Sequence, residues 1–346
     1  MLFVAVATAF NTGPVLHGNT ARVKVLTFAY PSHAGSLRRA YLVLPAWYGE
    51  RNHPPIPLVI SPHGRGVDGA YNLRFWGDLP ARGPFAVVSP DGQGRRLPLY
   101  SWGYAGQIDD LARLPALVRT AFPWLTIDPR RIYAAGDSMG GQEVLLLAAH
   151  PDVRLAGVAA FDAVTDMAAR YRAFFVTRGE HRLPALARTE IGGTPAELPD
   201  AYRARSPISS VVAIARRGVP LQLWWSFRDR VVTDQPRESG LFYRRLRTIA
   251  PGAPAQEVVG YWQHAHEMHP ATQLPAALAC FGLVPPSGIR VPAYRQQGSA
   301  GAIEELPPER RAPRVAFSRS FCGHAAGAPH RPLRKGMTRP IASAAM

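Results

Sequence analysis

The chain has 346 residues, of which 47% are hydrophobic and 10% aromatic, a composition that suits a globular protein with a sizeable core. Its formal net charge is +16 and is carried almost entirely by arginines scattered along the chain, with lysine only at positions 24 and 335. Because the basic residues form neither a helix face nor a stripe interleaved with aromatic residues, we expect no nucleic-acid partner. Two cysteines exclude a disulfide framework, and no apolar run approaches the roughly 18–20 residues of a membrane span.

Residues 23–28 and 39–44 alternate between apolar and polar side chains, which predicts two antiparallel strands joined by a turn. Short, continuously apolar runs follow, as expected of parallel strands that are buried on both faces. These runs, and the helical stretches between and after them, lie at residues 57–60, 85–88, 108–122 (helix), 132–135, 142–150 (helix), 155–161, 221–225, 257–260 and 270–281 (helix). The alternation predicts a doubly wound, mostly parallel sheet of the α/β class over residues 23–284.

Three segments do not follow this alternation of strands and helices. Residues 1–22 form an N-terminal extension whose apolar start lacks the basic segment of a signal peptide, which slightly favours a cytoplasmic over a secreted protein. Residues 165–217 are rich in arginine and aromatic residues and predict a helical cap over the C-terminal ends of the strands. Residues 285–346 are rich in Pro, Gly, Ala, Ser and Arg without a sustained period, which predicts a disordered tail. Cys280 is expected in the core and Cys322 in this tail.

The sequence Gly-Asp-Ser-Met-Gly-Gly at residues 136–141 is the strongest chemical signal. It stands between an apolar run typical of a strand and a run typical of a helix, and Gly-x-Ser-x-Gly in this setting indicates a nucleophile elbow. The serine of an elbow occupies a strained turn where flanking side chains would collide with neighbouring elements, which explains the glycines. A chance small-residue loop is one alternative. The Gly-Asp-Ser-Gly-Gly of trypsin-like proteases is another, but the additional Met139 and the following helix argue against it. We therefore predict a serine hydrolase with Ser138 as the nucleophile.

An elbow of this kind requires an acid and then a histidine later in the chain. Three histidines follow the last predicted strand, and His264 is the best candidate, with His266 as the alternative. The acid should follow the preceding strand, where Asp229 and Asp234 both occur. Asp234 suits the N-cap of a helix that begins near residue 235, so Asp229 is favoured and Asp234 stays an alternative. A buried carboxylate here would orient the imidazole and stabilise the imidazolium.

The negative charge that develops on the substrate oxygen needs two N–H donors. The residue after the nucleophile, Met139, should supply one of them. The second is expected from the loop Ser-Pro-His-Gly-Arg-Gly at residues 61–66, through the backbone N–H of Arg65 or, alternatively, of Gly64. Without an elbow, this loop would be an ordinary glycine-rich turn.

Four stretches resemble the α/β-hydrolase superfamily: Ser-Pro-His-Gly at 61–64, Ile-Asp-Pro-Arg-Arg-Ile-Tyr at 127–133, the elbow at 136–141 and Asp-Arg-Val-Val at 229–232. Within it, they are similar to the prolyl-oligopeptidase-like peptidases and esterases, including the polyhydroxybutyrate-depolymerase and feruloyl-esterase type. The acid of that branch stands in a Gly-x-x-Asp-x-x-Val pattern, which matches Asp229, although Ser226 replaces the usual glycine. Its histidine stands shortly after the last strand, which matches His264.

The resemblance covers roughly residues 23–283 and implies an eight-stranded sheet and hydrolysis through an acyl-enzyme, with no cofactor. It leaves the substrate open between a small-molecule ester and a short peptide. A metal site at His264, His266, Glu267 and His269 is a competing interpretation, but these residues lack the histidine spacing of zinc proteases, so no metal is expected. A catalytically silent binding protein with the same fold is a third interpretation, against which the ordered set of serine, acid and histidine argues.

Overall fold

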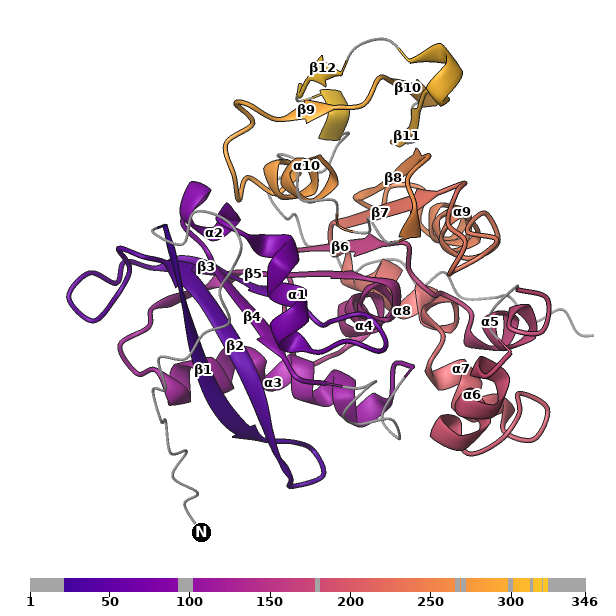
Figure 1. Ribbon diagram of the computed structural model, residues 1–346, viewed down its shortest axis with the longest axis horizontal. Coiled ribbons are helices and arrows are strands. Elements are labelled where there is room, and N and C mark those ends of the chain that lie inside the picture. Colours follow the sequence, from indigo (N-terminus) through magenta and orange to yellow (C-terminus); the bar gives the residue numbers. More distant parts are fainter. Residues whose placement is uncertain are drawn as a thin grey trace, which may run out of the picture.

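The computed structural model describes residues 22–92, 102–177, 181–264, 268, 272–297, 301–311, 314–318 and 320–322. Within these ranges, one sheet has the strand order β1-β2-β4-β3-β5-β6-β7-β8-β11-β10 (Figure 1). Its strands are β1 (Val23–Pro31), β2 (Leu37–Pro45), β3 (Ile56–Ile60), β4 (Ala86–Pro90), β5 (Ile127–Asp137), β6 (Gly157–Phe161), β7 (Leu221–Ser226), β8 (Ala255–Gly260), β10 (Tyr294–Gln297) and β11 (Ala302–Glu305). The seven neighbouring strands β4, β3, β5, β6, β7, β8 and β11 run parallel to one another. At the two edges, β1 and β2 on one side and β10 on the other pair antiparallel. The predicted doubly wound, mostly parallel sheet is confirmed.

Helices cover both faces of the sheet, which explains why the central strands are apolar throughout. In β3, Leu58 and Ile60 pack into one core cluster and Val59 into the other, because successive side chains of a strand point to opposite faces. The first cluster includes side chains of α3 (Ala105–Ala121), α4 (Ser138–Ala149), α8 (Val211–Arg217) and α9 (Ser239–Ile249). The second includes α1 (Gly69–Trp76), α2 (Leu79–Arg82) and α10 (Gln273–Cys280). In the part of the chain that the structure describes, no helix has the length and apolarity to cross a membrane.

The segment 165–217, where a cap is expected, contains α5 (Met167–Ala173), α6 (Leu183–Ile191), α7 (Pro199–Ala204), a 3-10 turn (Pro207–Ser209) and α8. The first three helices lie together beside the sheet (Figure 1) and form a small apolar cluster together with Trp102, Val164 and Val232. By contrast, α8 packs on the sheet with the main core. Glu238 holds the start of the segment, since its carboxyl group accepts N–H bonds from Thr165 and Asp166. Burial raises the pKa of Glu238 to about 7.

The expectation of a disordered tail from residue 285 needs correction for its first part. β11 pairs in parallel with β8, and β10 pairs with β11, so the expected eight-stranded sheet gains two strands. A second, two-stranded sheet joins β9 (Arg290–Val291) to β12 (Val315–Ala316). Ile303 and Phe321 are buried in the core. These strands are too short to show a period in the sequence, and pairing with a distant strand stabilises them. Residues 323–346 lie outside the described part.

A disulfide fastens this C-terminal segment to the domain, which corrects the expectation of an unpaired core cysteine and a cysteine in a loose tail. Cys280 at the end of α10 is bonded to Cys322 across 42 residues, with a Cα–Cα distance of 5.2 Å. Both side chains are buried in the core cluster that contains α10. The sequence has only this pair, so spacing alone carried no signal for the bond.

Replacing Cys322 with serine should lower the free energy of unfolding by about 2–4 kcal/mol, because the cross-link restricts the unfolded chain. Urea unfolding of the purified, oxidised protein measures this loss. Cys280→Ser and the double variant provide the control, since all three lose the same bond and should be destabilised about equally. Additive losses in the double variant would show that the two side chains act separately and that the bond is not formed.

Candidate active site

The turn between β5 and α4 holds Ser138 in the left-handed backbone region, with a φ of 54°. Few residues other than glycine adopt this conformation, and such strain is characteristic of functional turns. The neighbouring glycines are required sterically. A Cβ atom on Gly136 would lie 2.6 Å from the carbonyl oxygen of Gly140, and one on Gly140 would lie 2.4 Å from that of Pro62. The close approach of strand, helix and neighbouring loop therefore presents the serine at the C-terminal end of the parallel strands.

Changing Gly140 to alanine should disturb this turn, because the new methyl group meets a backbone carbonyl that cannot rotate away. We expect a loss of stability of about 1–3 kcal/mol from overpacking. Activity should fall by about 10²-fold, the effect of a misplacement near 1 Å. Steady-state ester hydrolysis and urea unfolding measure the two effects. Gly252→Ala is the matched control, since its Cβ meets nothing within 4 Å and both quantities should hardly change. Full activity of the Gly140 variant would contradict the steric argument.

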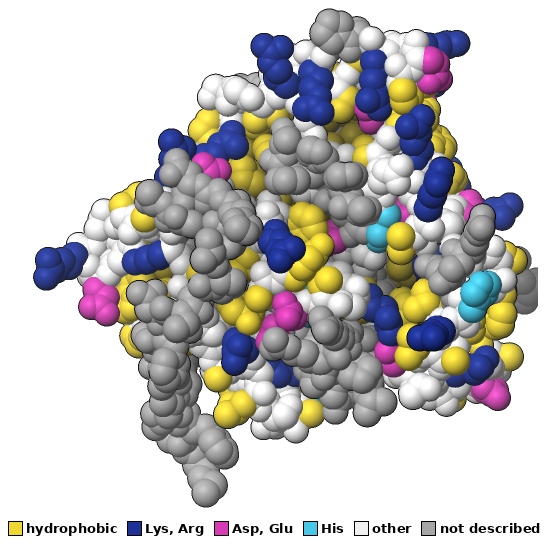
Figure 2. Space-filling view, viewed as in Figure 1, with side chains coloured by type: hydrophobic (Ala, Val, Ile, Leu, Met, Phe, Trp, Pro, Cys, Tyr) yellow, Lys and Arg dark blue, Asp and Glu magenta, His cyan; other side chains and the backbone are white. Residues whose placement is uncertain are grey.

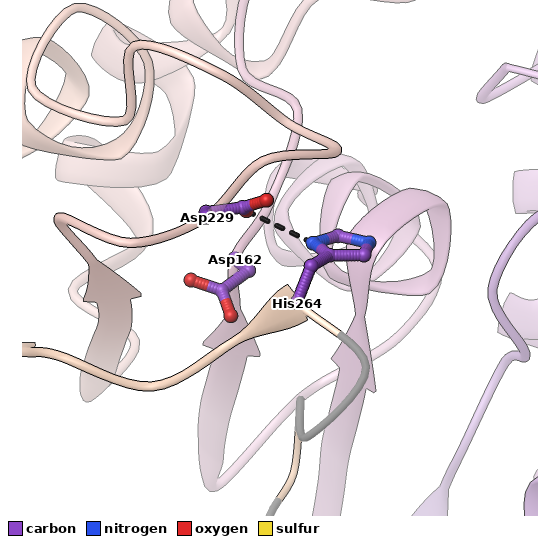
Figure 3. A group of neighbouring side chains, drawn as sticks. All are labelled: Asp162, Asp229 and His264. Atoms are coloured by element: carbon purple, nitrogen blue, oxygen red, sulfur yellow. Dashed lines mark hydrogen bonds and ion pairs between the residues drawn. The ribbon is translucent and has the colours of Figure 1, made fainter. Parts of the chain in front are cut away.

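Asp229 and His264 form a hydrogen-bonded pair, with Asp229 Oδ2 2.9 Å from His264 Nδ1 (Figure 3). The aspartate follows β7 and the histidine follows β8, so neighbouring strands bring together residues 35 positions apart. The second oxygen of Asp229 accepts the backbone N–H groups of Val231 and Val232 at 2.8 and 2.9 Å. The carboxylate side chain is fully buried. With Nδ1–H donating to this carboxylate, Nε2 of His264 is the nitrogen left to accept a proton.

The two alternatives from the sequence have different outcomes. Asp234 has a positive φ of 62°, and its half-exposed carboxylate lies 3.2 Å from the guanidinium of Arg237. The helix expected near residue 235 begins at Ser239, so Asp234 heads the preceding turn instead of capping the helix: its carbonyl oxygen accepts the N–H groups of residues 237 and 238. The other alternative, His266, and with it Glu267 and His269, lies outside the described residues.

Ser138 and His264 line one cavity of about 280 Å³. The rest of its wall is mainly apolar and comes from the sheet loops and the cap: Val67, Tyr71, Phe75, Trp102, Val164, Leu183, Val231 and Val232. Two arginines, Arg65 and Arg170, also line it. Over the visible face of the molecule, Lys and Arg side chains are dispersed among hydrophobic ones and do not merge into one patch (Figure 2). The cavity suits a small, largely apolar group next to the serine.

The loop after β3 lies against the elbow, where the second oxyanion donor is expected. A Cβ atom on Gly64 would lie 3.8 Å from Cβ of Ser138, so the backbone here comes close to the nucleophile. The side chain of Arg65 turns to the cap, where its guanidinium lies 2.6 Å from the carboxylate of Glu190 on α6 and stacks over the Trp102 ring. Met139, the other expected donor residue, is buried and lines the cavity.

His63 orients this loop, a role that the sequence did not reveal although the residue belongs to the motif. Its Nε2 accepts the N–H of Gly92 at 3.0 Å, so its Nδ1–H donates to the carbonyl oxygen of Gly64 at 2.7 Å. Burial lowers the pKa of His63, which keeps the ring neutral and preserves this pattern of one donor and one acceptor.

A further carboxyl group, Asp162, lies beside the pair (Figure 3). A carboxyl oxygen of Asp162, a carboxyl oxygen of Asp229 and a ring nitrogen of His264 all lie within 4.8 Å of one another. The oxygens of Asp162 accept N–H groups from Ser226 and Trp262. Sequence reasoning missed this residue, since a single aspartate after a buried strand carries no local signal.

No protein-family model and no curated protein matches the chain. Solved structures do match. A mutant of the esterase rPPE aligns with a TM-score of 0.56 and 18% identity, over 77% of this chain and 82% of that one. A fungal esterase from Rhizomucor miehei gives a TM-score of 0.56 at 15% identity, over 70% and 76%. The acylaminoacyl peptidase of Pyrococcus horikoshii gives a TM-score of 0.54 at 15% identity, over 71% of this chain.

The peptidases among these structures are much larger than the matched region. The chain spans 38% of the length of the Pyrococcus horikoshii enzyme and 33% of dipeptidyl peptidase 4 from Porphyromonas gingivalis. The two esterases are matched over most of their length. With the order of its strands, its serine turn and these similarities, the protein has the α/β-hydrolase fold, which it shares with these peptidases and esterases.

Proposed function

We propose that the protein is a serine hydrolase that cleaves a carboxylic ester through an acyl-enzyme, with Ser138, His264 and Asp229 as its triad. The observation that carries the proposal is the single cavity shared by a serine on a strained elbow and a histidine bonded to a buried carboxylate. These are the groups that acyl transfer requires, a nucleophile, a base and an orienting acid.

In the proposed reaction, Nε2 of His264 takes the hydroxyl proton while Ser138 Oγ attacks the substrate carbonyl carbon. The N–H groups of Met139 and Arg65, or Gly64 in place of Arg65, bind the oxygen that becomes negative. His264 then gives its proton to the leaving alcohol as the ester bond breaks, which leaves Ser138 acylated. Water repeats the sequence and releases the carboxylic acid. Asp229 holds the imidazole in one tautomer and stabilises its charged form.

Peptide cleavage is the second candidate, and the similarity to acylaminoacyl peptidase and dipeptidyl peptidase 4 favours it. Esters and amides share the acyl-enzyme and differ in the leaving group. The ester is preferred because the structures matched over most of their length are esterases, and because the cavity of about 280 Å³ suits a small acyl group.

The test is reaction with a fluorophosphonate probe, followed by peptide mapping of the labelled residue. Hydrolysis of p-nitrophenyl acetate and butyrate is measured alongside that of peptidyl p-nitroanilides. We expect labelling at Ser138 and turnover of the esters, unchanged by a metal chelator. Turnover of anilides at comparable kcat/KM would assign a peptidase. A folded protein that is neither labelled nor active would instead be a binding protein with this fold.

A further inference from the structure

The carboxyl group of Asp162 needs an explanation, because a second carboxyl beside Asp229 is electrostatically unfavourable. Asp162 follows β6, is fully buried and has a φ of 43°, a backbone conformation that favours glycine. Burial is the main cause that raises the pKa of Asp162 well above its usual range, and the negative charge of Asp229 is the second cause. A strained and buried acid is stable only where its hydrogen bonds offset the free-energy cost of the strain and of the lost hydration.

The contacts of Asp162 reach both loops of the proposed triad. Its Oδ1 accepts the backbone N–H of Ser226 at 3.0 Å, at the end of β7 and three residues before Asp229. Its Oδ2 accepts the indole N–H of Trp262 at 2.7 Å, two residues before His264. The backbone of Asp162 is itself tied to β7, because its N–H donates to the carbonyl oxygen of Trp224 at 2.7 Å. One carboxyl group therefore joins the turn that carries the acid to the turn that carries the histidine.

A direct bond between the two turns strengthens this junction. The hydroxyl group of Ser226 donates to the carbonyl oxygen of Trp262 at 2.5 Å. Ser226 is the residue that replaces the glycine usual in the acid motif of the resembling branch. The backbone N–H of a glycine could donate to Asp162 in the same way, but a glycine has no hydroxyl group to donate to Trp262. The departure from the motif thus supplies one of the connections between the two turns.

We propose that Asp162 is a positioning residue that holds the turn carrying His264 at a fixed distance from the turn carrying Asp229. This inference rests on the proposed function for its effect on catalysis, but the arrangement exists in the resting protein. Asp162 does not itself orient the imidazole, since the Nδ1 of His264 is bonded to Asp229.

Replacing Asp162 with asparagine tests the proposal, because an amide offers one acceptor oxygen where two N–H donors converge. We expect kcat for p-nitrophenyl butyrate to fall by about 10–100-fold, as for a misplaced catalytic group. KM should change by less than about threefold, because the cavity wall is unaltered. Trp262→Phe removes the donor at the other end of the same bond and should show a similar loss. The kcat of the double variant should be no lower than that of the less active single variant, since both changes break the same hydrogen bond between Asp162 and Trp262.

Trp225→Phe is the matched control. It also removes an indole N–H from a buried carboxyl group, that of Glu257 at 2.8 Å, but leaves the junction of the two turns intact. It should retain the kcat of the wild type. If Asp162→Asn fails to fold, Trp262→Phe alone decides the matter by the same split between kcat and KM.

A proton NMR measurement separates this inference from the proposed function. The Nδ1–H of His264, held against Asp229, should give a low-field signal in the resting protein, assigned by its loss in His264→Ala. We expect the signal to broaden or vanish in Asp162→Asn and Trp262→Phe and to persist in Trp225→Phe, whether or not any ester is cleaved. An unchanged signal and unchanged kcat in the first two variants would overturn the proposal. So would a loss in Asp162→Asn as large as that in Asp229→Asn, which would make Asp162 the acid of the triad.

Discussion

Ser138→Ala should reduce kcat for p-nitrophenyl butyrate by about 10⁴–10⁶-fold and abolish fluorophosphonate labelling. Removing the nucleophile of a serine hydrolase eliminates the covalent route and leaves only the rate contributed by binding and the oxyanion donors. Alanine keeps the β-carbon, and the strain of the turn, with its φ of 54°, is common to both side chains. The free energy of unfolding should therefore change by no more than about 1 kcal/mol.

Steady-state hydrolysis assays measure kcat, and unfolding followed by circular dichroism on the same samples measures the free energy of unfolding. Ser209→Ala serves as the control, because this serine is exposed in the short 3-10 turn between α7 and α8. It should match the wild type in activity and labelling. Activity above a few per cent of wild type in a folded Ser138→Ala protein would place the nucleophile elsewhere.

Asp229→Asn should reduce kcat by about 10⁴-fold, whereas Asp234→Asn should leave it within about twofold of the wild type. The carboxylate of Asp229 accepts Nδ1–H of His264, and an amide in its place would favour the wrong tautomer of the imidazole. Its other oxygen is held by the N–H groups of Val231 and Val232, so the amide nitrogen has no suitable place on that side and would face the histidine. The carboxylate of Asp234 forms a half-exposed ion pair with Arg237, and such pairs contribute little.

The two variants are matched in chemistry and lie on the same turn, so a comparison of their kcat values isolates the position of the charge. Thermal unfolding of both proteins checks that the loss is catalytic. The reverse ranking would transfer the acid to Asp234. Equal, small losses would show that His264 works without a carboxylate partner on this turn.

Much of the fold can be predicted from local patterns, because parallel strands covered by helices on both faces must be apolar at every position. Leu58, Val59 and Ile60 show this, with side chains in both core clusters. The elbow is only partly local: the steric limit at Gly136 comes from Gly140, four residues on, whereas the limit at Gly140 comes from Pro62 on the loop after β3. The order of serine, acid and histidine follows from strand order, and the structure brings Asp229 and His264 together at the ends of β7 and β8.

Other features depend on residues that are distant in the sequence. β10 and β11 are four residues each and form because β8 offers an open edge. The bond between Cys280 and Cys322 depends on that docking, across 42 residues.

The sequence by itself determined the sheet, the elbow and the candidates for acid and base, because periodicity and turn chemistry act over a few neighbouring residues. Only the tertiary structure decided the course of the C-terminal segment, the pairing of Arg65 with Glu190 and the place of Asp162 between the turns that carry Asp229 and His264. Each of these is a polar or covalent contact across 42 to 125 residues. Which two residues meet in each contact depends on how whole elements pack against one another, and no local sequence pattern records this packing.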